Sequence, residues 1–306
     1  MALSRLFWRA LLPGLGAVLA VQLPVQPASP TVVAVDGVLC DLTRTLARSA
    51  AEVVCLIPPG GDPHEHRLRP SDRQALSKAA LVLHNGFNLT PAATKMRGAG
   101  TVVAVAEKAM PGYKGRDPHV WHDPANVAAM ATVVASSLKS VLPPSQRSAL
   151  ASRAAEATAV LDGVGRWGSA QFATVPENQR VLVSEHQAFG HLANRFKLRP
   201  IALVDSFATG GVLRPSSLRR ITAKLKGSGA RALFPESLPV SKTLRRISRR
   251  TGISVSGAPL FADGLAPGRS TVATATLNIC TVVNAQGGRC DQAAADRLNS
   301  RWSAIR

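Results

Sequence analysis

Six of the seven histidines in this chain lie in three short clusters. Each cluster holds one pair: His64 and His66, His119 and His122, and His186 and His191. A fourth segment, Leu260 to Gly264, carries the carboxylate of Asp263. Imidazole combined with carboxylate suits a tetrahedral divalent cation, zinc above all. Three histidines and one carboxylate from four separate segments would complete such a site, although local zinc-finger spacing such as Cys-x-x-Cys does not occur.

The histidine clusters and the Asp263 segment each follow a short apolar run that predicts a buried β-strand. Such runs lie at 31–35, 53–57, 81–84 and 101–106, and again at 180–184, 200–204, 231–234 and 253–256. Helical patterns alternate with them at 39–50, 71–80, 124–142, 188–196, 216–226, 240–250 and 270–285, the last of which we expect to be the final helix. Short buried strands that alternate with helices predict parallel α/β sheets. Ligands of such sheets gather outside the carboxyl ends of the strands, which is where the polar clusters fall.

The alternation of strands and helices occurs twice, so we expect two α/β halves. An Ala-rich stretch after Pro143-Pro144 predicts one long helix between them, whose second half Gly163, Gly165 and Gly168 should weaken. The expected organisation is an N-terminal α/β domain at 31–142, a linking helix at 143–175 and a C-terminal α/β domain at 178–306. No Gly-x-Gly-x-x-Gly and no Walker loop occurs, so a nucleotide site lacks its usual phosphate cradle.

The first 28 residues have the pattern of a secretory signal peptide. Arg5 and Arg9 precede an apolar stretch, and small residues allow cleavage after Ala20 or Ala28. No cysteine lies near this region, which argues against a lipoprotein. We therefore expect a periplasmic protein.

The composition predicts a globular protein with an unusual charge. Among 306 residues, 46% are hydrophobic and 18% are charged, which excludes a disordered or fibrous chain. The net charge of +19 permits a nucleic-acid partner. A single tyrosine, the export signal and the lack of a recognisable nucleic-acid motif argue against one.

Four cysteines allow three pairings in an oxidising compartment. The pairings that close short loops are Cys40 with Cys55 and Cys280 with Cys290. We expect these two disulfides.

The chain resembles a known family, the periplasmic solute-binding receptors of ABC importers for zinc and manganese. The most specific stretch is Asp117-Pro118-His119-Val120-Trp121, and the likeness extends from about residue 32 to residue 283. Further matches are Asp62-Pro63-His64, His186 with Ala188-Phe189, Phe261-Ala262-Asp263, and Asn278 in the closing helix. The family fold that this resemblance implies is two Rossmann-like domains with parallel sheets, bridged by a long rigid helix.

The resemblance also implies the metal ligands, which are His64, His119, His186 and Asp263. Zinc receptors of this family have His at the third position, where manganese receptors have Glu. Here His186 holds that position, which favours Zn²⁺ because imidazole suits zinc better than manganese. A shift of one residue would instead place Glu185 in the site and favour Mn²⁺.

This chain departs from the family pattern at several histidines. It lacks the His-rich loop that many zinc members carry before the second motif. His122 stands where the family usually has Leu, and His191 where it usually has an aromatic residue. We expect neither to bind the main metal, and interpret both as supports of the ligands or as weak exterior ligands. His66 should point away from His64 on an extended loop, either solvated or as an entry ligand.

The resulting expectation is a monomeric, high-affinity zinc receptor, not an enzyme, that delivers the metal to the membrane permease of an ABC importer. The first alternative is a manganese receptor of the same family. The second is a secreted zinc hydrolase with Glu236 or Glu185 as general base. Four protein ligands would leave no open position for water, and no His-Glu-x-x-His helix occurs, which argues against the hydrolase.

Overall fold

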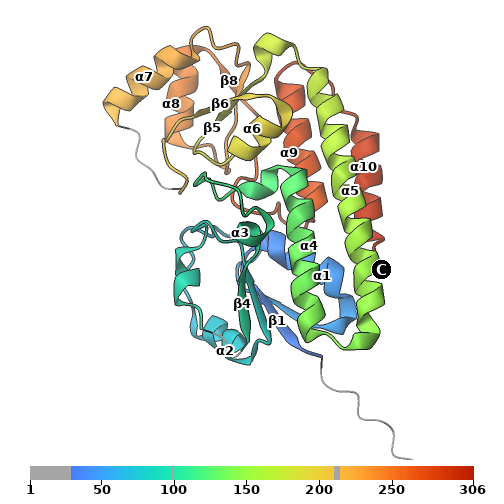
Figure 1. The fold of residues 1–306 in the computed structure, drawn as a ribbon. Helices are drawn as coiled ribbons and strands as arrows, with labels where there is room; N and C mark the ends of the chain where they lie inside the picture. Colours follow the sequence, from blue (N-terminus) through green and yellow to red (C-terminus); the bar gives the residue numbers. More distant parts are fainter. Residues whose placement is uncertain (1–28, 98–99, 210–213) are drawn as a thin grey trace, which may run out of the picture.

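A computed structural model describes residues 29–97, 100–209 and 214–306, which form two α/β halves side by side along one long helix (Figure 1). The expected signal peptide and its cleavage site lie outside these residues. Within the described ranges, no helix combines the length and apolar character needed to cross a membrane.

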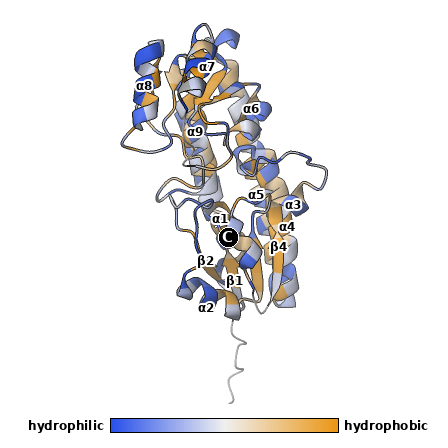
Figure 2. Ribbon diagram, turned by 90° about the vertical axis from the view of Figure 1, so that its left-hand side faces the viewer, coloured by the Kyte–Doolittle hydropathy of each residue, from blue (hydrophilic) through white to orange (hydrophobic). Residues whose placement is uncertain are grey.

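The first half is built on a four-stranded parallel sheet in the order β2-β1-β3-β4. The strands are β1 (Thr31–Ala34), β2 (Glu52–Cys55), β3 (Leu81–His84) and β4 (Thr101–Ala104). Apolar β-branched residues dominate β1, and its Val32 and Val33 are fully buried on opposite faces. This agrees with a sheet that is covered by helices on both sides. Figure 2 shows the apolar sheet inside a more hydrophilic shell.

Helices with clear start signals cover this sheet. They are α1 (Gly37–Ala47), α2 (Pro70–Lys78), α3 (Val105–Ala109) and α4 (Pro124–Val141). The side chain of Asp36 caps α1 by accepting from the Leu39 amide. The side chain of Asp123 caps α4, which starts with Pro124 at its first position.

The second half contains four strands that are paired in parallel, two of four residues and two of only two residues. They are β5 (Val181–Ser184), β6 (Arg199–Ala202), β7 (Ala232–Leu233) and β8 (Ser254–Val255). The amide of Phe234 donates to the carbonyl of Val183 at 3.0 Å, so β7 lies beside β5. Helices of this half are α6 (Gly190–Phe196), α7 (Pro215–Leu225), α8 (Lys242–Thr251), α9 (Thr271–Ala285) and α10 (Gln292–Ser303).

The connecting helix α5 (Arg147–Ala173) is a continuous helix of 27 residues. It packs against α1 and α4 of the first half and against α9 and α10 of the second. The helix continues through its three glycines, and two of them allow close packing. A Cβ on Gly165 would lie 2.7 Å from Nη2 of Arg195, and one on Gly168 would lie 2.7 Å from Cζ of Phe196. One continuous hydrophobic core includes residues of both halves, so the halves are held in a defined arrangement.

Three expectations about the elements are wrong. Val105 and Ala106 belong to α3 and not to the preceding strand. The 231–234 and 253–256 strands shorten to two residues each. The segment 270–285 is not the last helix, since α10 follows it. The signals for α10 were present: Asp291 caps the helix, and Ala295, Leu298 and Trp302 recur on its buried face.

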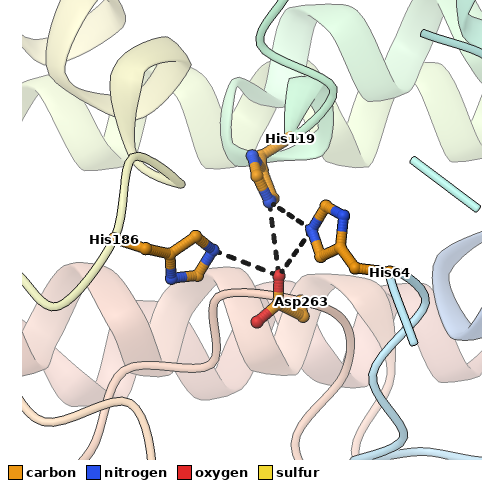
Figure 3. Close-up of side chains that lie close together, drawn as sticks. All are labelled: His64, His119, His186 and Asp263. Atoms are coloured by element: carbon orange, nitrogen blue, oxygen red, sulfur yellow. Dashed lines mark hydrogen bonds and ion pairs between the residues drawn. The ribbon is translucent and has the colours of Figure 1, made fainter. Parts of the chain in front are cut away.

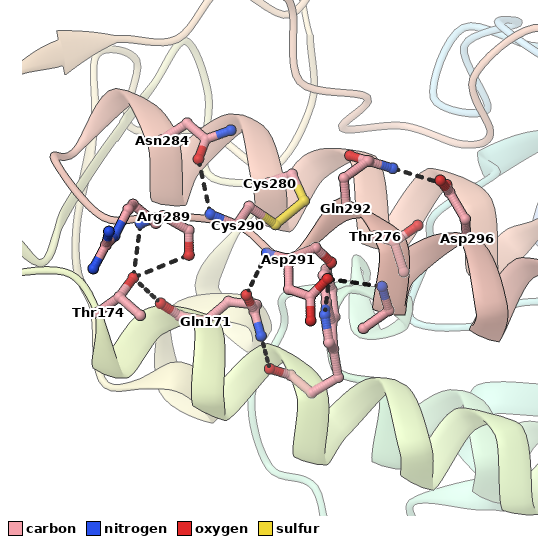
Figure 4. The surroundings of a disulfide bond; sticks show 12 residues. Gln171, Thr174, Thr276, Cys280, Asn284, Arg289, Cys290, Asp291, Gln292 and Asp296 are labelled. Atoms are coloured by element: carbon pink, nitrogen blue, oxygen red, sulfur yellow. Dashed lines mark hydrogen bonds between the residues drawn. A yellow bond between two sulfur atoms is a disulfide. The ribbon is translucent and has the colours of Figure 1, made fainter.

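Both expected disulfides are confirmed. Cys40 pairs with Cys55 across a separation of 15 residues, and Cys280 pairs with Cys290 across 10. The first ties α1 to β2. The second ties α9 to the turn before α10, where side chains at the C-terminal end of α5 also hold the chain (Figure 4). Gln171 accepts from the Asp291 amide at 2.7 Å, and Thr174, directly after α5, accepts from the Arg289 amide at 2.9 Å.

Thiol titration of the denatured but unreduced protein should therefore find almost no free thiol, and four per chain after reduction. Replacing Cys40 and Cys55 together by Ala should lower the free energy of unfolding by about 2–4 kcal/mol, because the cross-link restricts the unfolded chain. Urea unfolding measures this loss. The Cys280–Cys290 disulfide closes a shorter loop, so the matched Cys280→Ala/Cys290→Ala variant should lose slightly less stability. Four reactive thiols before reduction would contradict both assignments.

Candidate metal centre

Four side chains from four loops converge between the two halves (Figure 3). His64 lies in the loop after β2, His119 in the loop before α4, His186 directly after β5, and Asp263 in the loop after β8. One donor atom of each lies within 4.8 Å of the donor atoms of the others. The sequence placed each of these residues beyond a strand end, and the structure brings all four together.

The donor atoms are spaced as ligands of one small cation. Oδ1 of Asp263 lies 3.2 Å from Nε2 of His64 and 3.3 Å from Nε2 of His119 and of His186. The Nε2 atoms of His64 and His119 face each other at 3.1 Å. Donors bound tetrahedrally at zinc distances lie about 3.3–3.4 Å apart. The three contacts of Asp263 and the His64–His119 pair are therefore close to the spacing of ligands around a single zinc ion.

Carboxylates behind two of the imidazoles orient the rings. Oδ1 of Asp117 lies 2.8 Å from Nδ1 of His119, and Oε2 of Glu236 lies 2.5 Å from Nδ1 of His186. A carboxylate only accepts, so each Nδ1 carries a hydrogen and each neutral ring directs the lone pair of its Nε2 at the cluster. This carboxylate–histidine arrangement is typical of metal ligands.

The burial of the Nε2 atom of His186 is a separate observation that fits a metal ion at the cluster. The atom is buried, and among the described residues it makes no hydrogen bond, although Asp263 is near. In the neutral ring this nitrogen carries a buried lone pair that no donor satisfies, which is costly. A cation at the centre of the cluster would satisfy it, as would a proton shared with Asp263.

Local hydrogen bonds hold the ligand loops in shape. Oδ1 of Asp62 accepts from the amide of His64 at 2.8 Å, and Oδ1 of Asp117 accepts from the amide of His119 at 3.0 Å. These Asx turns use the Asp-Pro-His sequence common to both loops. Gly190 leaves room for Asp117, because a Cβ there would lie 2.5 Å from its Oδ2.

The His186 loop is held by two glutamates that bond reciprocally. Oε1 of Glu236 accepts from the amides of Glu185 at 2.8 Å and His186 at 3.2 Å. In return, Oε2 of Glu185 accepts from the amide of Glu236 at 3.0 Å. Glu185 therefore points toward the backbone of the neighbouring loop and is not one of the four converging donors.

The Asp263 loop is held from α9. The side chain of Asn278 accepts from the amide of Phe261 and donates to its carbonyl, both at 3.0 Å. The carbonyl of Ala262 accepts from Nε2 of His122 at 2.9 Å. The loop that presents Asp263 is thus fixed by residues of both halves.

The negative charge around the cluster changes the protonation of its histidines. Burial disfavours the charged form of His186, but the carboxylates of Asp263 and Glu236 outweigh it and raise its pKa to about 10. Burial also opposes protonation of His119, yet Asp117 and Asp263 raise its pKa. Burial would raise the pKa of Asp263, but its three histidine neighbours hold that pKa far below its usual range. Without a metal, protons therefore occupy part of the cluster at neutral pH.

The remaining histidines lie outside the four-residue cluster. His66 is not solvated, which was one of the two alternatives expected for it, because its side chain is only 10% exposed and lies 3.3 Å from Oδ2 of Asp72. His191 lies beside the His119 loop, with Nε2 3.3 Å from the carbonyl of Asp117. Burial, assisted by nearby His119, lowers the pKa of His122 to about 3.

Sequence reasoning missed the residues that orient the imidazoles. It gave Asp117 no role, and it considered Glu236 only as the general base of a hydrolase. Asp117 could have been found from the sequence, because a carboxylate two residues before a histidine is a local signal for a group that orients the imidazole. No local signal existed for Glu236, which is 50 residues from His186 in the chain.

The cluster is accessible from two clefts. One, of about 350 Å³, borders His186 and Asp263, and another, of about 840 Å³, reaches His64. Near the first cleft, Thr209 of the second half donates a hydrogen bond to Asp62, which shapes the His64 loop. An ion can therefore reach the donors between two halves that are also in direct contact.

Comparisons with known proteins agree with this geometry. The family model described as zinc-uptake complex component A, periplasmic, matches residues 32–281. The chain is 26% identical over 274 residues to the zinc-binding protein TroA of Treponema pallidum, covering 84% of this chain and 88% of that protein. It is 25% identical over 252 residues to the manganese ABC transporter substrate-binding lipoprotein PsaA of Streptococcus mitis, covering 77% and 81%. The solved structure of the periplasmic zinc-binding protein TroA superposes with a TM-score of 0.78 at 25% identity, covering 85% of this chain and 99% of that one.

Metal binding should release protons, because a ligand histidine must be neutral. With the pKa of His186 at about 10 and that of His119 raised, uptake near pH 7 should release at least one proton per ion. Affinity should then rise at least about tenfold per pH unit from pH 6 to 8. Isothermal titration calorimetry in buffers of different ionisation enthalpy counts the protons. Glu236→Gln removes one carboxylate that raises the pKa of His186 and should reduce the release. Equal heats in all buffers would contradict this expectation.

Proposed function

This chain belongs to the family of periplasmic zinc-uptake complex component A proteins, and we propose that it is a high-affinity zinc receptor that delivers the metal to the permease of an ABC importer. The observation that carries the proposal is the convergence of three imidazole nitrogens on one carboxylate oxygen, with carboxylates behind two of the rings. In this proposal His64, His119, His186 and Asp263 bind one Zn²⁺ as cargo. The relatedness to TroA, named as a zinc-binding protein, supports the same function.

The donor set favours zinc over manganese. Three imidazoles and one carboxylate suit a borderline-soft ion, whereas manganese prefers more oxygen donors. A manganese receptor is the alternative, because PsaA is a relative named for manganese. The residue that would have supported manganese, Glu185, is engaged by the amide of Glu236 and the hydroxyl of Ser241.

A hydrolase is a poorer explanation of the same cluster. Four protein donors fill a tetrahedral zinc, whereas catalytic zinc keeps one position for water. Glu236, the candidate base, is already bonded to His186 and to two backbone amides. We therefore propose a receptor that binds and releases its cargo without chemistry.

The arrangement of the donors suggests how cargo is retained and released. His64 and His119 belong to the first half, and His186 and Asp263 to the second, so an ion bound between them links the halves. Separation of the loops by a small movement would break several metal bonds at once. We propose that contact with the permease causes this movement, that the protein acts as a monomer, and that the N-terminal signal peptide directs it to the periplasm.

Zinc should stabilise the protein through all four donors. At a thousandfold excess over its dissociation constant, it should add about 4 kcal/mol to the free energy of unfolding. His119→Ala and His186→Ala should each remove most of the resulting rise in melting temperature. The matched controls His66→Ala and His84→Ala lie outside the cluster and should retain it. Retention of the full rise by His186→Ala would refute the four-donor site.

Exchange of the third donor should change metal preference. His186→Glu replaces an imidazole by a carboxylate, so it should weaken zinc binding and strengthen manganese binding relative to zinc. Competition titrations with both metals measure the ratio of affinities. Glu185→Gln is the control and should leave that ratio unchanged. If manganese but not zinc stabilises the wild type, the protein is the manganese receptor instead.

A further inference from the structure

His122 links three of the four loops that carry the proposed zinc ligands. It belongs to one of them, three residues after His119, and contacts two others. Its ring packs against Phe189, three residues after His186, with ring centroids 4.5 Å apart. Its Nε2 lies 2.9 Å from the carbonyl oxygen of Ala262, the residue before Asp263.

The tautomer of His122 follows from its partner. A carbonyl oxygen only accepts, so Nε2 carries the hydrogen and donates it. The contact is shielded from water, because His122 is 6% exposed and Ala262 is 3% exposed. A buried carbonyl that lost this donor would have no water to replace it.

The hydrogen bond acts on Asp263 through one rigid unit. The carbonyl of Ala262 and the amide nitrogen of Asp263 belong to the same planar peptide group. Fixing the oxygen therefore restricts the orientation of the backbone from which the Asp263 carboxylate projects. Asn278 holds the preceding peptide groups through Phe261 from the second half, and His122 holds this one from the first.

We propose that His122 is a positioning residue that holds the Asp263 carboxylate at the zinc site by donating to the carbonyl of Ala262. Since this bond crosses between the halves, it also joins the loop of His119 to the loop of Asp263. The inference rests on the proposed zinc site and adds to it a residue outside the four ligands.

Two substitutions separate the hydrogen bond from the packing. His122→Phe keeps an aromatic ring against Phe189 and removes the donor. His122→Gln restores an N–H near the position of Nε2. Zinc dissociation constants from chelator competition should rise about 10–100-fold for His122→Phe, the usual cost of losing a group that orients a ligand. His122→Gln should recover most of that loss.

A double-mutant cycle with Asp263→Ala tests the route of the effect. If His122 acts through Asp263, then His122→Phe should leave the zinc affinity of the Asp263→Ala variant unchanged. The matched control is His191→Phe, whose histidine contacts the Asp117 carbonyl and not the Asp263 loop, so its effect should be equal in both backgrounds. Circular dichroism of the metal-free variants verifies that each is folded.

Three results would overturn the inference: unchanged affinity in His122→Phe, failure of His122→Gln to restore it, or an equal loss in the Asp263→Ala background. Failure of the proposed zinc site, on which the inference rests, is distinguishable from all three, because wild-type protein would then not bind zinc at all.

Discussion

The fold brings Oδ1 of Asp263 within 3.3 Å of three imidazole nitrogens, and the rest of the structure is needed to hold these four groups together. Each of the four residues comes from a different loop, and no two of the loops are consecutive along the chain. Loops alone could not hold four donors at such distances, since ordering them costs conformational entropy. The parallel sheets meet this requirement because they bring loops from distant segments to neighbouring strand ends.

The frame around the cluster limits how far those loops can move. Helix α5 packs against both halves, and one hydrophobic core runs through residues of both. Asn278 from α9 and His122 from the first half form hydrogen bonds with adjacent peptide groups just before Asp263. Large separation of the halves would disrupt this core, so metal exchange is better served by small loop displacements than by wide domain opening.

The carboxylates have two effects that must balance. Asp117 and Glu236 orient their imidazoles for a metal, and with Asp263 they also raise the affinity of those rings for protons. The same negative charge therefore attracts a metal cation, and at low pH it also favours protons, which compete with the metal for the imidazoles. A divalent ion gains from all the donors at once, whereas each proton occupies one ring.

The sequence by itself determined much of the fold. Apolar runs placed the first four strands within a residue or two, two of the three histidine clusters marked loops after strands, and short cysteine separations predicted both disulfides. The His119 cluster instead follows α3. These features are local, because strand formation, helix capping and short-loop pairing depend on nearby residues. The helix α10 was also encoded locally, through Asp291 and its buried face, and was overlooked.

Only the tertiary structure decided which residues support the cluster. Glu236 meets His186 from 50 residues away, His122 meets Ala262 from 140 residues away, and His66 turns to Asp72. A single sequence carries residue types but not distances between loops, so it could propose donors without identifying the groups that orient them. Those partners depend on how β7 docks beside β5, how β8 pairs with β7 and how α9 packs against α5, which are long-range contacts that no local pattern specifies.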